Sequence, residues 1–398
     1  MEKIKSNNKS IYVLIILVPF LMGLGVDLYV PSLLQISSFF KSSSNLVELT
    51  VSLYLLGYGL GQIVLGILSD SLGRKKILVI STILFILMSL GCIISFNLIL
   101  LNLFRFFQGI FVAGLAVVAR AALVDLFAGT ELSKFTNYFT ISWSLGPIIA
   151  PFIGSFLANS FGWKSNFYLF TVYGIVIFVY SIFIFKETNI DKSKIDIKTY
   201  KLNIIKICTS PMFILITVVS ALGYGAIVLF NTVGPYLIEK TLRYSITDYG
   251  YIAMFLGFAY FLGAIINRIL IKKVKSDALL SFGIMGAIIC GIIMWILSYI
   301  QTNKLVAIII PIFCMFFLVG FIVPNALYKT MELFKDIAGT ASAIFGTLTG
   351  IVVFIITLLG ENLTISSQLP LTLGYLIIFI LAIILIIISK RLMIKIKI

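Results

Sequence analysis

One acidic residue, Asp27, lies inside a long apolar stretch of the sequence. The stretch begins at Ile11 and continues through Gly23–Pro31, whereas the other acidic residues, Glu48 and Glu239 among them, fall in loops or near the ends of apolar runs. A carboxylate in the hydrocarbon region of a membrane is costly, and it usually faces a partner or a water-filled cavity. We therefore take Asp27 as a candidate site for binding and releasing a proton. The alternative is that the helix ends early and leaves this carboxylate in solvent.

Arg105 is the basic residue placed most like Asp27, because it also lies within an apolar run. If both runs cross a membrane as helices, both residues lie roughly 10 Å below the outer surface at about 1.5 Å per residue. An acid and a base at one depth can share a cavity between helices, where Asp27 would carry the proton and Arg105 would bias its charge. A static ion pair that fixes the first helix against the fourth is the alternative.

The composition excludes an ordinary soluble protein. Of the 398 residues, 61% are hydrophobic and 11% are charged, and the mean hydropathy is +1.15, whereas a soluble domain is about half apolar and about a quarter charged. Apolar runs of about 17–25 residues are the unit that crosses a membrane as a helix. The sequence contains twelve of them, at 11–33, 47–68, 77–95, 98–123, 136–158, 166–185, 211–235, 249–270, 277–299, 304–328, 338–359 and 370–389. We expect an all-α integral membrane protein with twelve transmembrane helices.

The basic residues predict how the chain is oriented. It carries 30 Lys and Arg against 15 Asp and Glu, a net charge of +15. With both termini in the cytoplasm, most of these basic residues fall in cytoplasmic segments, as the positive-inside rule requires. The net positive charge is then explained by the orientation of the chain in the membrane. It does not indicate nucleic-acid binding, so no nucleic-acid partner is expected. The absence of histidine and the unpaired spacing of the four cysteines indicate no metal, cofactor or disulfide.

A long polar interruption divides the sequence into two similar halves. We expect an N-terminal six-helix bundle over 1–185, a cytoplasmic linker over 186–210 and a C-terminal six-helix bundle over 211–398. Tyr58–Gly61 resembles Tyr260–Gly263, and each segment lies on the second apolar run of its half. Two pseudo-symmetric bundles with a site between them are the plan of many transporters.

The segment Gly66–Lys76, Gly-Ile-Leu-Ser-Asp-Ser-Leu-Gly-Arg-Lys-Lys, joins the second and third runs. Gly66 and Gly73 would allow a close helix approach and a tight turn. Asp70 can cap a helix or pair with an arginine, and Arg74 faces anionic headgroups together with the two lysines that follow it.

This segment resembles the signature loop of the major facilitator superfamily, in which the loop latches the cytoplasmic face while two bundles rock. The resemblance assigns the latch to Asp70 and Arg74, together with Arg120 and Asp125 as partners. The copy in the second half has Lys272 near the position of the acid, so a second latch is not expected there.

Further motifs indicate one branch of this superfamily. Leu103–Gly109 resembles the fourth-helix motif, whose arginine (here Arg105) faces the cavity and is tied to proton transfer. Leu145–Gly154 resembles the fifth-helix motif of antiporters, and its distinctive residues are Gly146, Pro147, Pro151 and Gly154. Asp27–Pro31, Pro324–Ala326 and Ala338–Ala343 resemble the bicyclomycin-resistance and chloramphenicol-efflux (Bcr/CflA) branch. Lys164 departs from the arginine that the family usually has after a tryptophan.

Polar residues within the apolar runs suggest an aromatic-rich cavity for partly apolar compounds of modest size. The candidate lining residues are Tyr29, Tyr58, Gln108, Asn231, Tyr260 and Asn325. Each of them could instead serve helix packing.

The sequence thus predicts a proton-coupled antiporter of the bacterial inner membrane. It would export small amphipathic compounds such as antibiotics by alternating access, in contact with membrane lipid and as a monomer. A transporter of the same fold for a metabolite, amino acid or siderophore is the alternative. An intramembrane enzyme would need clustered catalytic groups, a channel would need a filter or rings of like charge, and no phosphate-binding loop for ATP is present.

Overall fold

The structure, a computed structural model, describes residues 9–127, 129–189, 197–300, 305–360 and 367–396. These described residues contain twelve helices long and apolar enough to cross a membrane. This confirms the predicted all-α membrane fold. Lipid offers the backbone no hydrogen bonds, so each apolar run satisfies its own backbone as a helix.

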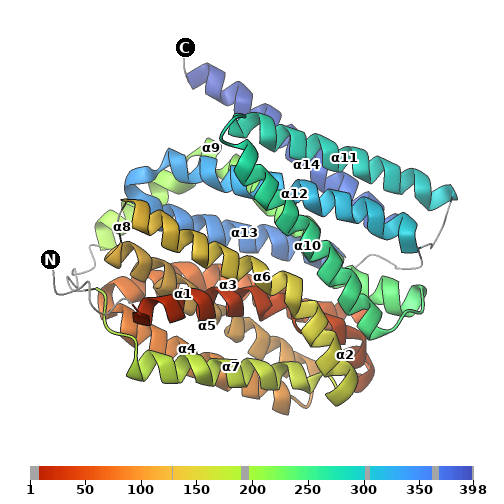
Figure 1. Cartoon of the computed structure of the whole chain (residues 1–398), viewed down its shortest axis with the longest axis horizontal. Helices are drawn as coiled ribbons and strands as arrows, with labels where there is room; N and C mark the ends of the chain where they lie inside the picture. The colour runs from red at the N-terminus through yellow and green to blue at the C-terminus, as the bar shows by residue number, and fades with distance from the viewer. Residues whose placement is uncertain (1–8, 128, 190–196, 301–304, 361–366, 397–398) are drawn as a thin grey trace.

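The helices of the first half lie together in the lower part of Figure 1. They are α1 (Lys9–Asp27), the 3₁₀ turn η2 (Val30–Ser32), α2 (Leu33–Phe40), α3 (Ser44–Leu72), α4 (Arg74–Ile94), α5 (Leu98–Leu126), α6 (Gly129–Phe161) and α7 (Lys164–Phe183). Within this half α3 packs on α5, α1 on α6, and α4 on both α5 and α7.

The helices of the second half form the upper group in Figure 1. They are α9 (Pro211–Pro235), the π-helical segment η3 (Tyr236–Thr241), α10 (Ile246–Leu270), α11 (Ser276–Ile300), α12 (Leu305–Leu333), the short 3₁₀ turn η4 (Lys335–Ile337), α13 (Ala338–Gly360) and α14 (Leu369–Ile396). The helix α8 (Ile197–Cys208) lies in the predicted linker, of which residues 190–196 are outside the described part of the chain.

The two halves meet along two seams, one between α3 and α13 and one between α6 and α10. On the first seam the Thr347 hydroxyl donates to the Gly59 carbonyl at 2.7 Å, and the Ser52 hydroxyl donates to that of Thr357 at 2.6 Å. We call the end of the molecule that carries Gly73, between α3 and α4, the Gly73 end. The opposite end, where α3 begins, is the Glu48 end.

The first membrane crossing is broken at Asp27. Helix α1 ends there, and the crossing continues through η2 and α2 to Phe40. Pro31 lacks the N–H that would continue the α-helical pattern. The predicted end of this run near residue 33 is therefore too early. Asp27 lies near the middle of the crossing, deeper than the roughly 10 Å expected from the sequence.

Helix α6 packs both on this first crossing and on α10 of the second half. A Cβ added at Gly146 would come within 2.4 Å of the Gly23 Cα, and one at Gly154 within 1.7 Å of the Leu28 carbonyl oxygen. Both glycines therefore stand where backbones approach closely. On its other side α6 meets α10, where a Cβ on Gly257 would lie 3.1 Å from the Pro147 carbonyl oxygen. Pro147 and Pro151 are both inside this helix.

Replacing Gly154 with alanine should destabilise the protein, because the new Cβ would overlap the Leu28 carbonyl. Overpacking of this kind costs about 1–3 kcal/mol, which a lower melting temperature of the purified protein in detergent would report. Gly339→Ala is the matched control, since nothing lies within 4 Å of a Cβ there. If Gly154→Ala melts no lower than Gly339→Ala, the described packing is incorrect.

Candidate functional site

The Asp27 carboxylate is buried at the interface between the two halves. Its residue is 5% exposed, and its Oδ1 accepts a hydrogen bond from the Asn231 side-chain amide on α9. An acid of the first half is thus held by a neutral residue of the second half. Asn231 was one of the residues predicted to line a cavity, but its bond to Asp27 was not predicted.

The sequence contains a signal for this contact that hydropathy does not reveal. Asp27 is followed four residues later by Pro31, and Asn231 is followed four residues later by Pro235. In each case the proline cannot donate a hydrogen bond to the carbonyl four residues before it. The two segments hold equivalent places in the two halves, on the first crossing of each. Their polar residues meet at the interface.

Arg105 is fully buried inside the first half. Its guanidinium carbon lies 4.1 Å from the ring centroid of Tyr29 and 4.1 Å from that of Tyr54. It donates hydrogen bonds to the Gly25 carbonyl, at 3.1 Å, and to the Gln108 side chain. Two aromatic faces and a carbonyl therefore stabilise this buried cation.

Asp27 and Arg105 do not form an ion pair. None of the ion pairs among the described residues joins them, which contradicts the static ion pair considered as an alternative from the sequence. Arg105 instead binds the backbone two residues before Asp27, and Tyr54 lies within electrostatic reach of both residues. Arg105 is therefore linked to Asp27 through the backbone of the first crossing and not by a direct contact between the two side chains.

Tyr54 from the first half and Tyr224 from the second half both lie within electrostatic reach of Asp27. Tyr224, on α9, lies within electrostatic reach of Asp27, Tyr54, Tyr58 and Tyr260. Its ring also lies 6.5 Å from that of Trp143, which belongs to the other half. The sequence analysis named Tyr58 and Tyr260 but missed Tyr224 and Trp143, because nothing in a single apolar run distinguishes an inward-facing aromatic residue from one that faces lipid.

Three other residues predicted to line the cavity make contacts within one half. Tyr29 donates or accepts a 2.8 Å hydrogen bond with Thr50 beneath Arg105, and Gln108 donates to Ser89 at 2.7 Å. Asn325 donates to Asn267 at 2.6 Å and accepts from Ser276 at 2.8 Å. We therefore leave Tyr29, Gln108 and Asn325 out of the proposed cavity.

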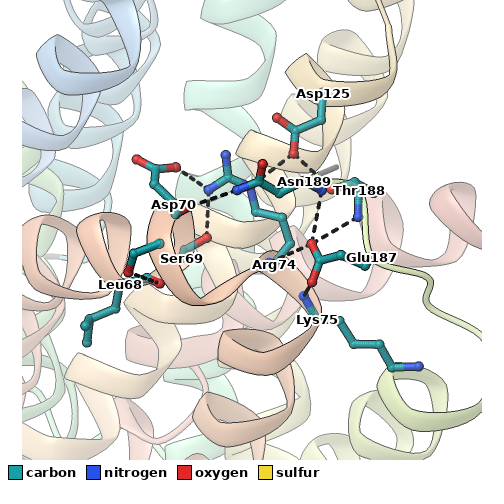
Figure 2. Close-up of polar contacts among 10 residues, drawn as sticks. Leu68, Ser69, Asp70, Arg74, Lys75, Asp125, Glu187, Thr188 and Asn189 are labelled. Atoms are coloured by element: carbon teal, nitrogen blue, oxygen red, sulfur yellow. Dashed lines mark hydrogen bonds and ion pairs between the residues drawn. The ribbon is translucent and has the colours of Figure 1, made fainter. Parts of the chain in front are cut away.

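A second polar cluster surrounds Arg74 at the Gly73 end (Figure 2). Gly73 has φ = +102°, a conformation that suits glycine and lets the chain turn between α3 and α4. Arg74 forms ion pairs with Asp70 and, at 3.0 Å, with Asp125, and it donates to the Ser69 hydroxyl at 2.9 Å. The structure thus brings together three of the four predicted latch residues.

The start of the linker is tied to the same cluster, as Figure 2 shows. Glu187 accepts hydrogen bonds from the backbone N–H groups of Arg74, at 2.8 Å, and Lys75, at 3.2 Å. It therefore places a negative charge at the N-terminus of α4, where the helix dipole favours an anion. Thr188 donates to Asp125 at 2.9 Å and Asn189 to the Asp70 carbonyl at 2.8 Å. The sequence analysis did not identify this role for residues 187–189.

Two predictions about this loop differ from the structure. Arg120 lies apart from the Arg74 cluster, because its side chain donates to Gln62 at 2.7 Å and, across the interface, to Ser342 at 3.4 Å. A Cβ on Gly66 would make only ordinary contact, 3.5 Å from Val117. Gly66 is therefore not required for a close helix approach at this point.

The second half contains a counterpart of the latch pair with the charges reversed. Arg74 at the start of α4 pairs with Asp125 near the end of α5. At the equivalent places Asp277, at the start of α11, pairs with Lys329 near the end of α12. The sequence analysis expected no second latch because Lys272 stands near the position of the acid, and it did not identify this pair, in which the acid and the base have exchanged helices.

Residues 15–357 match the family model of the Major Facilitator Superfamily, and the chain therefore belongs to this superfamily of transporters. It is 27% identical over 363 residues to a bicyclomycin resistance protein homolog of Haemophilus influenzae, a match that covers 86% of this chain and 87% of the relative. It is 26% identical to the multidrug resistance protein MdtL of Shewanella oneidensis, with 81% of each chain covered. These relatives confirm the predicted resemblance to the drug-efflux branch.

Solved structures show the same fold at low sequence identity. A D-xylose-proton symporter matches with a TM-score of 0.77 and 15% identity, covering 96% of this chain and 97% of the other. A bacterial homolog of the human lysosomal transporter Spinster matches with a TM-score of 0.75 and 14% identity, covering 97% of both chains. Membership of the Major Facilitator Superfamily and the twelve candidate membrane spans among the described residues make this chain a multi-pass membrane transporter rather than an enzyme.

Arg105→Lys should impair the protein although it keeps the positive charge. An ammonium group cannot lie flat between Tyr29 and Tyr54 while also reaching Gly25 and Gln108, so we expect a loss of about 1–3 kcal/mol in stability. Thermal melting of the purified protein measures this loss. Arg268→Lys, on an exposed side chain, is the matched control. Equal melting temperatures for the two variants would contradict the described role of Arg105.

Substitution of Asp125 should destabilise the folded protein more than substitution of Asp70, although both acids form ion pairs with Arg74. The Asp125 side chain is 20% exposed and that of Asp70 is 52% exposed. We expect Asp125→Asn to cost about 1–3 kcal/mol, since it weakens a partly buried pair, and Asp70→Asn to cost at most about 1 kcal/mol, as exposed pairs do. Melting temperatures in detergent give the ranking, and the reverse order would overturn this account of the cluster.

Proposed function

We propose that this protein is a proton-coupled antiporter that exports small amphipathic compounds, such as antibiotics, across the bacterial inner membrane by alternating access. The observation that carries the proposal is the Asp27 carboxylate, buried between the halves and held only by a neutral amide among the described residues. The names of the relatives, a bicyclomycin resistance protein homolog and a multidrug resistance protein, support the choice of substrate class.

The exchange of substrate for protons would follow from their competition for the carboxylate of Asp27. An ionised Asp27 can accept hydrogen bonds from Asn231 or from a polar group of the substrate, whereas a proton on the same carboxyl removes the charge that attracts them. The hydroxyls of Tyr58, Tyr224 and Tyr260 would hold the apolar body and polar edges of the substrate beside it. Substrate and proton would therefore occupy the site in turn, and each conformational change would carry one of them.

The Gly73 end faces the cytoplasm in this proposal, and both chain termini lie on that side. The basic residues of the turns at this end support the orientation, because positively charged segments remain in the cytoplasm. The Arg74 cluster would hold the first half rigid at this end. Arg120 would help close it through the contact with Ser342 in the second half.

Asp27→Asn should abolish the exchange while leaving the amount of protein in the membrane unchanged. The amide is nearly the same size as the carboxyl but cannot carry the proton. Everted membrane vesicles with an acidified lumen measure this directly, because export of bicyclomycin into the lumen should release lumenal protons. We expect the signal of Asp27→Asn to fall to that of vesicles without the protein.

Asp248→Asn is the matched control for this experiment. Asp248 is exposed and accepts hydrogen bonds from the N-cap residue Ser245 at the start of α10, and the side-chain oxygen of asparagine can accept the same bonds. This variant should retain full exchange. Drug-dependent proton release that persists in Asp27→Asn would contradict the proposed mechanism. A response to amino acids but to no drug would favour the alternative metabolite transporter.

A further inference from the structure

The helix α8, on the left in Figure 1, is not one of the twelve candidate spans among the described residues. It covers Ile197–Cys208, and its 12 residues are too few to cross a membrane. The span that begins at Pro211 follows it after only two residues. Three peptide steps place Cys208 within about 11 Å of the first residue of that span. The end of α8 therefore lies close to the membrane surface.

One side of α8 packs against the second half. Ile207 is fully buried in an apolar cluster with Phe213 from the start of α9 and with Ala341 and Ile344 from α13. Ile204, which lies one turn before Ile207, is partly buried against the same cluster. This packing holds α8 on the second half and determines which of its sides remains exposed.

The outer side of α8 combines apolar and basic side chains. Leu202 is 58% exposed and Ile205 is 47% exposed. At 3.6 residues per turn these two lie next to each other on the helix surface, between the exposed Lys201 and the exposed Lys206. The sequence of α8 contains no acidic residue, and no ion pair among the described residues includes either lysine. The outer side of α8 therefore carries positive charge around an apolar centre.

This combination fits the boundary between membrane lipid and water. Apolar side chains of an interfacial helix enter the region between headgroups and acyl chains, while the long stems of lysines carry their ammonium groups to the phosphates. The lipids of the cytoplasmic leaflet include anionic ones, whose charge is opposite to that of the lysines. An acidic soluble protein would match the same lysines, but it would compete with headgroups that are already within reach of α8.

We propose that the outer side of α8, formed by Lys201, Leu202, Ile205 and Lys206, binds anionic phospholipids at the membrane surface. The two apolar side chains contact the first methylenes of the acyl chains, and the two ammonium groups contact phosphate oxygens. The inference goes beyond the proposed function, because it requires neither a transported substrate nor a proton. It takes only the orientation from that proposal, which places these lipids in the cytoplasmic leaflet.

Lipid bound to α8 lies close to the interface between the two halves. The stretch of α13 that packs on α8 through Ala341 and Ile344 also meets the first half. Within this stretch, Ser342 and Thr347 are hydrogen-bonded to residues of the first half. The membrane surface and the first seam are therefore separated by a single helix, α13.

The exposed Cys208 provides a labelling site at the end of α8. It follows Lys201 by seven residues and so lies on the same side of the helix. In the full chain without the other three cysteines, a nitrobenzoxadiazole fluorophore on Cys208 reports bound lipid by a blue shift of its emission. In neutral detergent, phosphatidylglycerol should half-saturate this shift at a concentration at least about fivefold below that of zwitterionic phosphatidylcholine, because each lysine near anionic lipid adds to the affinity.

The doubly substituted protein, Lys201→Gln with Lys206→Gln, should bind the two lipids equally, because its amides carry no charge. Lys272→Gln with Lys273→Gln removes two exposed lysines from the turn between α10 and α11. This matched control should keep the preference of the parent for phosphatidylglycerol. Equal half-saturation by both lipids in the parent would overturn the proposal, and so would an unchanged preference in the Lys201 and Lys206 variant.

Leu202→Gln with Ile205→Gln tests the apolar part of the surface. Both half-saturation concentrations should rise at least about threefold, because less apolar surface is buried in lipid, while the preference for phosphatidylglycerol remains. Unchanged concentrations would overturn the proposed insertion. Glycerol phosphate, which has the headgroup charge without acyl chains, should cause no blue shift. A shift with polyglutamate as large as that with phosphatidylglycerol would reject lipid in favour of an acidic protein partner.

Asp27→Asn separates this inference from the proposed function. The lipid preference measured at Cys208 should be unchanged in that variant, because the outer side of α8 is intact, and its loss would contradict the proposed surface. If Asp27→Asn still exchanges drug for protons in vesicles, the antiport mechanism fails even where α8 binds lipid as proposed. If the α8 variants show no change in lipid binding, the lipid surface is rejected while the antiport mechanism stands.

Discussion

A buried carboxylate without a counter-charge is the constraint on which the rest of this structure depends. Burying an ionised group in an apolar interior is costly unless it is paired. Asp27 receives one hydrogen bond from a neutral amide, and that amide belongs to the other half. Its charge state is therefore tied to how the two halves are placed. In the proposed mechanism, this arrangement links proton binding by Asp27 to the movement of one half relative to the other.

The buried arginine has a different part in this arrangement. Arg105 is held by two tyrosine rings, a glutamine and a backbone carbonyl of the first half. All of these partners belong to the first half, so in the proposed mechanism the charge of Arg105 keeps a fixed place relative to Asp27 while the second half moves. A direct ion pair would instead hold Asp27 ionised and oppose its protonation.

The ends of the molecule differ in how they use charge. At the Gly73 end, ion pairs lie within each half, and the Asp277–Lys329 pair repeats the Arg74–Asp125 pair with reversed sign. These contacts make each half rigid but do not join the halves. At the Glu48 end, no ion pair among the described residues includes Glu239.

Much of this architecture could be predicted from the sequence, because the hydropathy of each segment identifies a membrane-spanning helix without any knowledge of distant contacts. The twelve helices, the polar division near residue 186 and the glycine turn at Gly73 all follow from local composition. The Asp27–Asn231 contact does not, since the two residues lie in different halves, although the repeated spacing to Pro31 and Pro235 offered a clue. Glu48 lies near the start of α3, as the sequence predicts, but its burial depends on the folded structure and could not be predicted from hydropathy.

The central claim is that Asp27 exchanges a proton within the membrane. Infrared difference spectra of protein labelled with carbon-13 at the aspartate carboxyl groups measure this exchange directly, because a protonated carboxyl has its own stretching band. The account predicts a labelled band that grows as pH falls and is missing in Asp27→Asn. A band that titrates identically in Asp27→Asn, or no titrating band in the native protein, would contradict it.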